Sequence, residues 1–444
     1  PPARRPAAPP PRPPPPPPPP PPPAPPPPPA RPPPPPRPPP RPPPRGGSRL
    51  AGHRRRISPW GKAPDEAAPR RWCDRVPIAG GLSLRREAAI HGRGFWIRPM
   101  VVEVLSGVSL AALYWWEIDR LGLIPPGVAA PSSAVLHATF VLHAVLIGLM
   151  LVASLIDVDE KTIPDAITVS GTLFALAAAA IVPWSLLPSA LRMPPGGGPF
   201  GLPAMMPATD FLKLTSPDEW PAGLSGFPHL LPLGIGLGCW WIWCVGLMHR
   251  TWYDRHGWIR AWGLMCARLR RERSTWWILL MGLAGSAAIA SVWLLRGDRW
   301  AGFLSALVGT VASGGIIWVI RVVGTAVLRR EAMGFGDVTL MAMMGAFLGW
   351  QPCLIVFILA PFAGLLFGLG SLILRRGPEI PYGPFLCVAG LVVIVRWAAL
   401  WEATGSIFGL GEWLVMVMLL CLMVMVPLLM LTRLVRVAFE QWLR

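Results

Sequence analysis

Apolar residues in this chain are gathered into long runs that short polar and basic stretches separate. A mostly apolar run of about 18 residues or more is typical of a membrane-spanning helix. The pattern predicts an all-α polytopic membrane protein with about ten transmembrane helices joined by short loops. The runs fall at about 100–117, 133–156, 166–187, 228–248, 276–295, 302–324, 338–350, 353–374, 384–401 and 411–432. The run at 338–350 is short for a full span, so we expect its ends to be partly buried or the bilayer to be locally thinned.

The distribution of charge sets the expected orientation of these helices. The 444 residues are 52% hydrophobic and 14% charged, with a net charge of +18. The basic residues outside the N-terminal segment concentrate in short stretches between apolar runs, as in cytoplasmic loops. We therefore expect the lipid bilayer, and no nucleic acid, as the partner of this charge. The stretches assigned to the cytoplasmic side are 249–275, 325–337, 375–383 and the tail 433–444.

Composition also divides the chain into segments. Residues 1–45 are almost pure Pro, which predicts a disordered or polyproline II segment, and 46–98 form a basic cytoplasmic region. Membrane helices follow over 99–187 and 301–432, with a further segment at 188–300 and a cytoplasmic tail at 433–444. The first residue is not Met, so the true N-terminus and an upstream helix stay open.

Two aspartates stand at the ends of apolar runs. Asp157 directly follows Leu151–Ile156, and Asp337 closes a Gly-Phe-Gly-Asp string before the run at 338–350. A carboxylate within a membrane helix costs about 2.5–3.5 kcal/mol at mid-helix, and such residues usually face a cavity or a partner. The orientation above brings both to the cytoplasmic face, which favours a catalytic pair.

Each aspartate also has a simpler interpretation. Asp337 would then be the N-cap of a helix that begins near Val338. Asp157 would belong to a hydrated surface loop with Asp159 and Glu160, while Asp165 caps the next helix.

Three separated blocks favour the catalytic interpretation, because together they resemble the type IV prepilin peptidase family. A fourth block, from Arg98 to Trp115, resembles the helix that follows the cytoplasmic loop of that family. The resemblance covers roughly 74–180 and 325–400. The three blocks are Ile156-Asp157 with Ile163-Pro164-Asp165, then Met333-Gly334-Phe335-Gly336-Asp337, and then Ile380-Pro381-Tyr382-Gly383-Pro384.

The resemblance implies an intramembrane aspartic endopeptidase with Asp157 and Asp337 as catalytic residues. An endopeptidase of this kind needs no metal and no cofactor. The implied substrates are type IV prepilins or pseudopilins of a pilus or type II secretion system, cut at the cytoplasmic face of a bacterial inner membrane. The expected substrate-binding residues are Gly334, Gly336, Asp165, Gly383 and Pro384.

The chain departs from the family pattern in three places. The 46–98 region lacks the two C-x-x-C pairs that often accompany N-methyltransferase activity, and only His53, Cys73 and His91 could bind zinc there. We therefore expect neither zinc nor methyl transfer. Thr339 stands where the family commonly has Lys, and 188–300 resembles an insertion that adds two helices.

Two other classes of protein remain open. A presenilin-like protease shares the G-x-G-D string, although the chain has no Pro-Ala-Leu string near its C-terminus. A transporter or assembly protein would use the aspartates as ion sites. The sequence does not identify the pilin, the oligomeric state or the role of 188–300.

Overall fold

A computed structural model describes most of the chain beyond the Pro-rich segment. The described ranges are 69–92, 94–190, 209–248, 263, 266–267, 270–328, 333–373 and 381–442. The predicted segment 1–45, His53, and the larger part of the basic stretches at 249–275 and 375–383 lie outside these ranges. The chain divides into two units, residues 1–100 and 101–444.

The described part of the first unit is a set of short helical turns. They are η2 (Trp72–Arg75), α2 (Ala79–Ser83), η3 (Leu84–Glu87) and α3 (Ala88–His91). Two buried carboxylates hold these turns together. Asp74 accepts hydrogen bonds from Ser83, from the Arg71 N–H at 2.6 Å and from Arg86 at 2.5 Å. Glu87 forms ion pairs with Arg70 and His91 at 3.1 and 3.3 Å.

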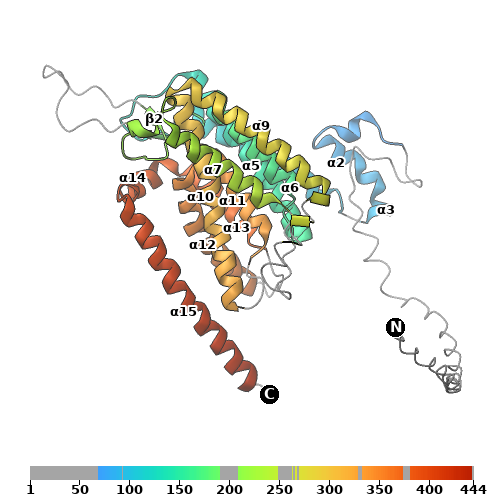
Figure 1. The fold of residues 1–444 in the computed structure, drawn as a ribbon. Helices are drawn as coiled ribbons and strands as arrows, with labels where there is room; N and C mark the ends of the chain where they lie inside the picture. Colours follow the sequence, from blue (N-terminus) through green and yellow to red (C-terminus); the bar gives the residue numbers. More distant parts are fainter. Residues whose placement is uncertain are drawn as a thin grey trace, which may run out of the picture. The chain divides into compact units, whose positions relative to one another are not determined.

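The second unit is helical apart from one antiparallel hairpin of β1 (Pro188–Ala190) and β2 (Thr209–Phe211), as far as the structure describes it. Figure 1 shows the long helices lying side by side. Those before the hairpin are α4 (Ile97–Tyr114), η4 (Trp115–Asp119), α5 (Ser133–Glu160) and α6 (Asp165–Ile181). Those after it are η5 (Ala222–Leu224), α7 (Leu230–Leu247), α9 (Arg273–Leu295), α10 (Gly297–Leu328), α11 (Phe335–Leu348), α12 (Trp350–Ile373), α13 (Gly383–Val395), α14 (Trp397–Phe408) and α15 (Glu412–Trp442).

The all-α polytopic class is confirmed, whereas the predicted number of about ten spans is not. Each predicted run contains a helix, but within the described residues only seven helices have the length and hydropathy of a span. An eighth is reached if α13 and α14, which meet at 95°, count as one span. Helices α6 and α11 are shorter. Residues 337–348 of α11 are buried on every side, so other helices surround this helix in place of lipid.

Small residues allow α10 and α11 to pack closely. A Cβ added at Gly309 of α10 would overlap the backbone carbonyl of Gly345 in α11, and the reverse is also true. At Gly314 an added Cβ would lie 2.9 Å from the Ala342 side chain. Such small-residue contacts let helix backbones approach in a membrane, where water provides no driving force for helix association. Gly309 and Gly345 therefore form a close contact between the two helices.

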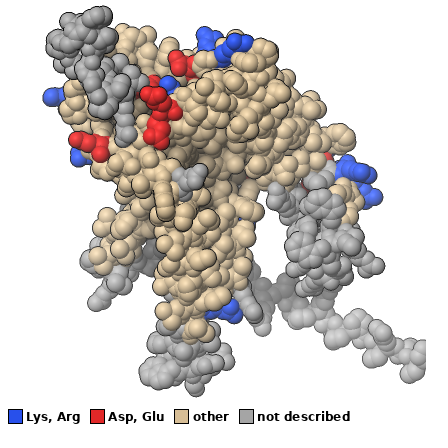
Figure 2. Space-filling view, turned by 60° about the vertical axis from the view of Figure 1, so that its left-hand side comes forward, with Lys and Arg blue, Asp and Glu red and all other residues tan. Residues whose placement is uncertain are grey.

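The surface of the molecule agrees with a bilayer environment. On the face shown in Figure 2, Lys, Arg, Asp and Glu form small separate groups, and broad areas carry none of them. Large apolar side chains are exposed along several helices, including Leu366 of α12 and Met423 of α15, each 74% exposed. In water such a surface would be unfavourable, whereas lipid solvates it.

The contact between α10 and α11 predicts the effect of adding a methyl group. Gly309→Ala should lower the free energy of unfolding by about 1–3 kcal/mol, because overpacking displaces one helix. Gly315→Ala is the matched control on the same helix, since a Cβ there meets nothing within 4 Å. Denaturant unfolding in micelles measures both. Equal stability of the two variants would show that α10 and α11 do not pack as described.

The first unit predicts a pH dependence. Burial by itself raises the pKa of Asp74, but hydrogen bonds from Ser83, the Arg71 N–H and Arg86, with the charge of Arg86, together lower this pKa from 3.8 to about 2. The resulting stabilisation is therefore fully present above about pH 4 and is lost as the pH falls through about 2. Amide exchange of residues 74–83 in the full chain, corrected for intrinsic rates, should rise only in that window. Asp74→Asn should raise the exchange at neutral pH and remove its rise at low pH. If the same rise at low pH remains in that variant, Asp74 is not the group that causes it.

Candidate active site

Asp157 is buried because of its place on α5. The buried residues Leu146, Met150, Ala153 and Asp157 recur at spacings of three and four, so they share one face of the helix. Asp157 is 3% exposed. The helix continues through Asp159 to Glu160 and ends where Lys161 adopts a left-handed conformation. The predicted hydrated loop therefore begins four residues later than expected, and Asp157 is a helical residue.

Asp337 lies in the first turn of α11. Gly334 is the N-cap, so Asp337 occupies the third helical position and is not the N-cap that the simpler interpretation required. Its carboxylate accepts a hydrogen bond from the Gly334 backbone. The positive end of the helix dipole favours a negative charge at this position. Asp337 is 7% exposed, so it is both buried and held at a helix start.

The turn between α5 and α6 brings three helix ends together around Ile163. A Cβ added at Gly336 would lie 2.8 Å from Cβ of Ile163 and 3.3 Å from its backbone nitrogen. A Cβ added at Gly383, the first residue of α13, would lie 2.9 Å from Cδ1 of Ile163 and 2.5 Å from Oδ2 of Asp157. Ile163 therefore fits between two glycines that the sequence analysis assigned to substrate binding. Here both of them contact the protein itself.

The two carboxylates lie at this same junction, although 180 positions separate them in the sequence. Gly383 packs against both Ile163 and Oδ2 of Asp157, and Gly336, which precedes Asp337, packs against Ile163. Oδ2 of Asp157 is buried and has no hydrogen-bond partner among the described residues, while the Gly383 backbone interacts with this carboxylate. Tyr382 and Cys387 of the neighbouring α13 lie within electrostatic range of Asp337. Two buried carboxylates, one with an unpartnered oxygen, can hold a water molecule and share one proton.

Arg321 of α10 supports this arrangement, and the sequence analysis did not identify it. Its Nε donates a hydrogen bond of 2.9 Å to the Met333 carbonyl, directly before Gly334. Its guanidinium lies 5.8 Å from the centre of the Phe335 ring. A basic residue inside the apolar run 302–324 was the available signal, because an intramembrane charge needs a partner.

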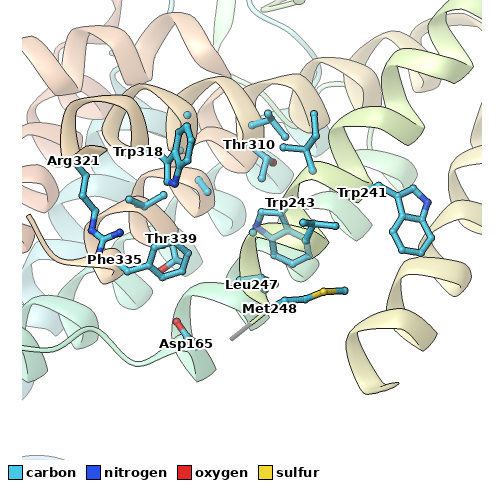
Figure 3. A pocket seen from close by; sticks show the side chains of 18 residues that line it. Asp165, Trp241, Trp243, Leu247, Met248, Thr310, Trp318, Arg321, Phe335 and Thr339 are labelled. Atoms are coloured by element: carbon cyan, nitrogen blue, oxygen red, sulfur yellow. The ribbon is translucent and has the colours of Figure 1, made fainter. Parts of the chain in front are cut away.

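The other predicted site residues lie in different surroundings. Asp165, the first residue of α6, is exposed and lines a cavity that α7, α10 and α11 surround (Figure 3). Thr339 lines the same cavity and donates a hydrogen bond of 3.1 Å to the Gly336 carbonyl. Pro384 is half-buried in the first turn of α13.

The described residues contain no group of three or more His, Cys, Asp and Glu side chains that could hold a metal ion. Cys73 is exposed and its thiol lies 3.9 Å from Oδ1 of Asp74. His53 lies outside the described ranges. The prediction of no zinc thus stays a prediction.

Comparison with known proteins identifies a family segment. Residues 271–369 match the model described as the type IV leader peptidase family, which confirms the resemblance predicted from the motifs. The matched segment contains Asp337 and overlaps the predicted insertion 188–300 over 271–300. Asp157 and α7 lie outside it. The bounds of the insertion stay a prediction.

Similar proteins from several bacteria carry one name, prepilin leader peptidase/N-methyltransferase. The protein of Aeromonas salmonicida strain A449 is 36% identical over 93 residues, which is 20% of this chain and 32% of that protein. The Pseudomonas aeruginosa protein is 30% identical over 121 residues, 27% of this chain and 40% of that protein. The Escherichia coli K12 protein is 30% identical over 89 residues, which is 20% of this chain and 40% of that protein. No solved structure matches.

This chain spans about a third of the length of the first curated relatives it matches. The family segment, the apolar helices and the bacterial relatives together define a multi-pass protein of the bacterial inner membrane. The absence of methyl transfer stays a prediction, because the relatives are named for both activities.

The packing around Ile163 predicts that the two glycines of the G-x-G-D string differ in how well they tolerate substitution by Ala. Gly336→Ala should displace Ile163 and raise amide exchange at residues 161–167, with a loss of about 1–3 kcal/mol in unfolding free energy. Gly334→Ala is the matched control, because its Cβ would meet only Oδ2 of Asp337 at 3.6 Å and the Gly336 nitrogen at 3.9 Å. Hydrogen-exchange mass spectrometry compares both with the parent. Greater disturbance by Gly334→Ala would contradict the packing of Ile163.

Proposed function

We propose that this protein is an intramembrane aspartic endopeptidase that removes the leader peptide of type IV prepilin-like or pseudopilin precursors at the cytoplasmic face. One observation carries the proposal. Two buried carboxylates that are distant in sequence, Asp157 of α5 and Asp337 of α11, lie at one junction of helix ends, and Asp337 belongs to the segment that matches the leader peptidase family. The names of the relatives support the choice of prepilins as substrates.

The proposed mechanism uses the repulsion between the carboxylates. Two such groups in a medium of low polarity do not both ionise easily, so Asp157 and Asp337 share one proton. The ionised carboxylate takes a proton from a water molecule, and the water oxygen attacks the scissile carbonyl carbon. The protonated carboxyl donates its proton to the carbonyl oxygen. Collapse of the tetrahedral intermediate then breaks the C–N bond as the nitrogen is protonated.

The support around the carboxylates gives each of them a fixed position. The Gly334 backbone donates a hydrogen bond to Asp337, and the Gly383 backbone donates one to Asp157. Such confinement matters because a displacement of about 1 Å in a catalytic group can lower a rate on the order of 100-fold. Basic residues of a substrate leader would be attracted to acidic groups at this end of the helices, such as Asp165.

The proposal predicts that both aspartates are essential. Asp157→Asn and Asp337→Asn should each lower prepilin cleavage by at least about 10³-fold, because either change removes one partner of the shared proton. Cleavage of a purified prepilin by the purified variants in micelles, followed by mass spectrometry, measures the effect. Both variants should keep the thermal stability of the parent, since Asn has nearly the same size as Asp.

Asp165→Asn is the matched control. Asp165 belongs to the same turn region but is exposed, so its loss should alter cleavage far less. Turnover like that of the parent in either Asp157→Asn or Asp337→Asn would exclude the catalytic pair. Loss of turnover in Asp165→Asn, with Asp157→Asn active, would place the catalytic carboxylate at the start of α6.

A further inference from the structure

A cavity of about 820 Å³ lies between α7, α10 and α11. Figure 3 shows Trp243 of α7 near its centre, with Trp318 and Arg321 of α10 and Phe335 and Thr339 of α11 along one side. We call this cavity the α7 groove. Apart from Asp165, the residues that line it have no part in the mechanism proposed above.

The α7 groove begins beside the candidate active site. Phe335, Val338 and Thr339 line it, and these residues flank Asp337 within one turn of α11. Asp165, the first residue after the turn between α5 and α6, lines the same groove. A chain bound in the groove could therefore continue to the carboxylates within a few residues.

The lining of the groove indicates the chemistry of its occupant. Most of its wall is apolar, and Trp318 and Ile242 are 43% and 62% exposed. Glycines of α7 and α10, Gly246 and Gly315, line it with open space above them, as in surfaces that receive another helix closely. At the end nearest Asp337 the groove has one exposed carboxylate, Asp165, and one cation, Arg321, which is hydrogen-bonded to the Met333 carbonyl and lies beside the Phe335 ring. An apolar helix that follows a basic segment complements this pattern.

Helix α9 packs behind the α7 wall of the groove and holds it in place through hydrogen bonds. Nε1 of Trp240 donates a hydrogen bond of 2.9 Å to the Gly282 carbonyl of α9, and Nε1 of Trp241 donates one of 3.1 Å to Ser286. Both tryptophans contact glycines of α9, because a Cβ at Gly282 or Gly285 would overlap their rings. Helix α7 lies outside the family segment at 271–369 and inside the predicted insertion 188–300.

We propose that the α7 groove binds the apolar helix of the substrate and that α7 is its specificity-determining wall, with Asp165 facing the basic leader. This rests on the proposed function for the identity of the substrate. The mature helix would pack one face against Trp243, Trp318 and Val338. The scissile bond, on the leader side of the helix, would then lie at Asp337.

The test measures binding separately from cleavage. The probe is a labelled synthetic peptide with a short Lys-containing leader that ends in Gly, followed by roughly 20 apolar residues. Its affinity for the full chain in nanodiscs is measured in the Asp157→Asn background, which leaves the probe intact. Gly315→Leu and Gly246→Leu fill the groove from two walls and should each weaken binding at least about tenfold. Gly238→Leu, on α7 where a Cβ meets nothing within 4 Å and outside the groove, should bind like the parent.

A second probe, in which Ser replaces each Lys, tests whether Asp165 faces the basic leader. Asp165→Asn should weaken the Lys probe and leave the Ser probe unchanged. Equal affinities of the Gly315→Leu, Gly246→Leu and Gly238→Leu proteins would overturn the proposal that the α7 groove binds the substrate helix. A parent protein that does not bind the probe would overturn it as well. Loss of a bound phospholipid in the filled variants, with probe affinity unchanged, would also overturn it and identify lipid as the occupant. The proposed function is judged independently, by cleavage in the Asp157→Asn and Asp337→Asn proteins.

Discussion

The electrostatic interaction between Asp157 and Asp337 is the constraint on which the rest of this structure depends. A charge inside an apolar helix bundle is unfavourable unless a partner, a water molecule or a proton compensates it. Here the two groups meet from α5 and α11, and the surrounding residues are small or apolar. The fold must therefore hold two mutually repelling groups together, and the glycine contacts explain how it does so. Gly336 and Gly383 accept Ile163, while Gly309 and Gly345 fix α11 against α10.

The helical class and the two aspartates could be predicted from the sequence, because both depend on local patterns. The length of an apolar run reports a helix directly, and a carboxylate at the end of such a run is unusual by composition alone. The number of spans could not be obtained in this way. The run at 338–350 has the hydropathy of a membrane helix, yet its helix is short and surrounded by protein. The run at 384–401 contains a 95° bend that hydropathy does not reveal.

The packing role of the glycines beside the two aspartates also required the structure. The sequence predicts that Gly336 leaves room for a substrate, and this role stays a prediction; the structure adds that a Cβ at Gly336 would lie 2.8 Å from Ile163. The contact joins two segments that are far apart in the chain, so no local pattern could predict it. The same is true of Arg321, whose hydrogen bond to the Met333 carbonyl supports the start of α11, and of the groove that α7 forms with α10 and α11.

The most direct test of the central claim is the proximity of positions 157 and 337 in the native membrane. In a chain without its seven cysteines, the double variant Asp157→Cys/Asp337→Cys is treated with a short bis(methanethiosulfonate) reagent, which forms a disulfide with each introduced thiol, and a protease then cuts at a site introduced between β1 and β2. The predicted result is two fragments that stay joined until reduction. Gly148→Cys with Asp337→Cys is the matched control, because Gly148 lies nine residues, or roughly 13 Å, along α5 from Asp157. Fragments that separate in the first pair, or that stay joined equally in both pairs, would contradict a shared carboxylate site.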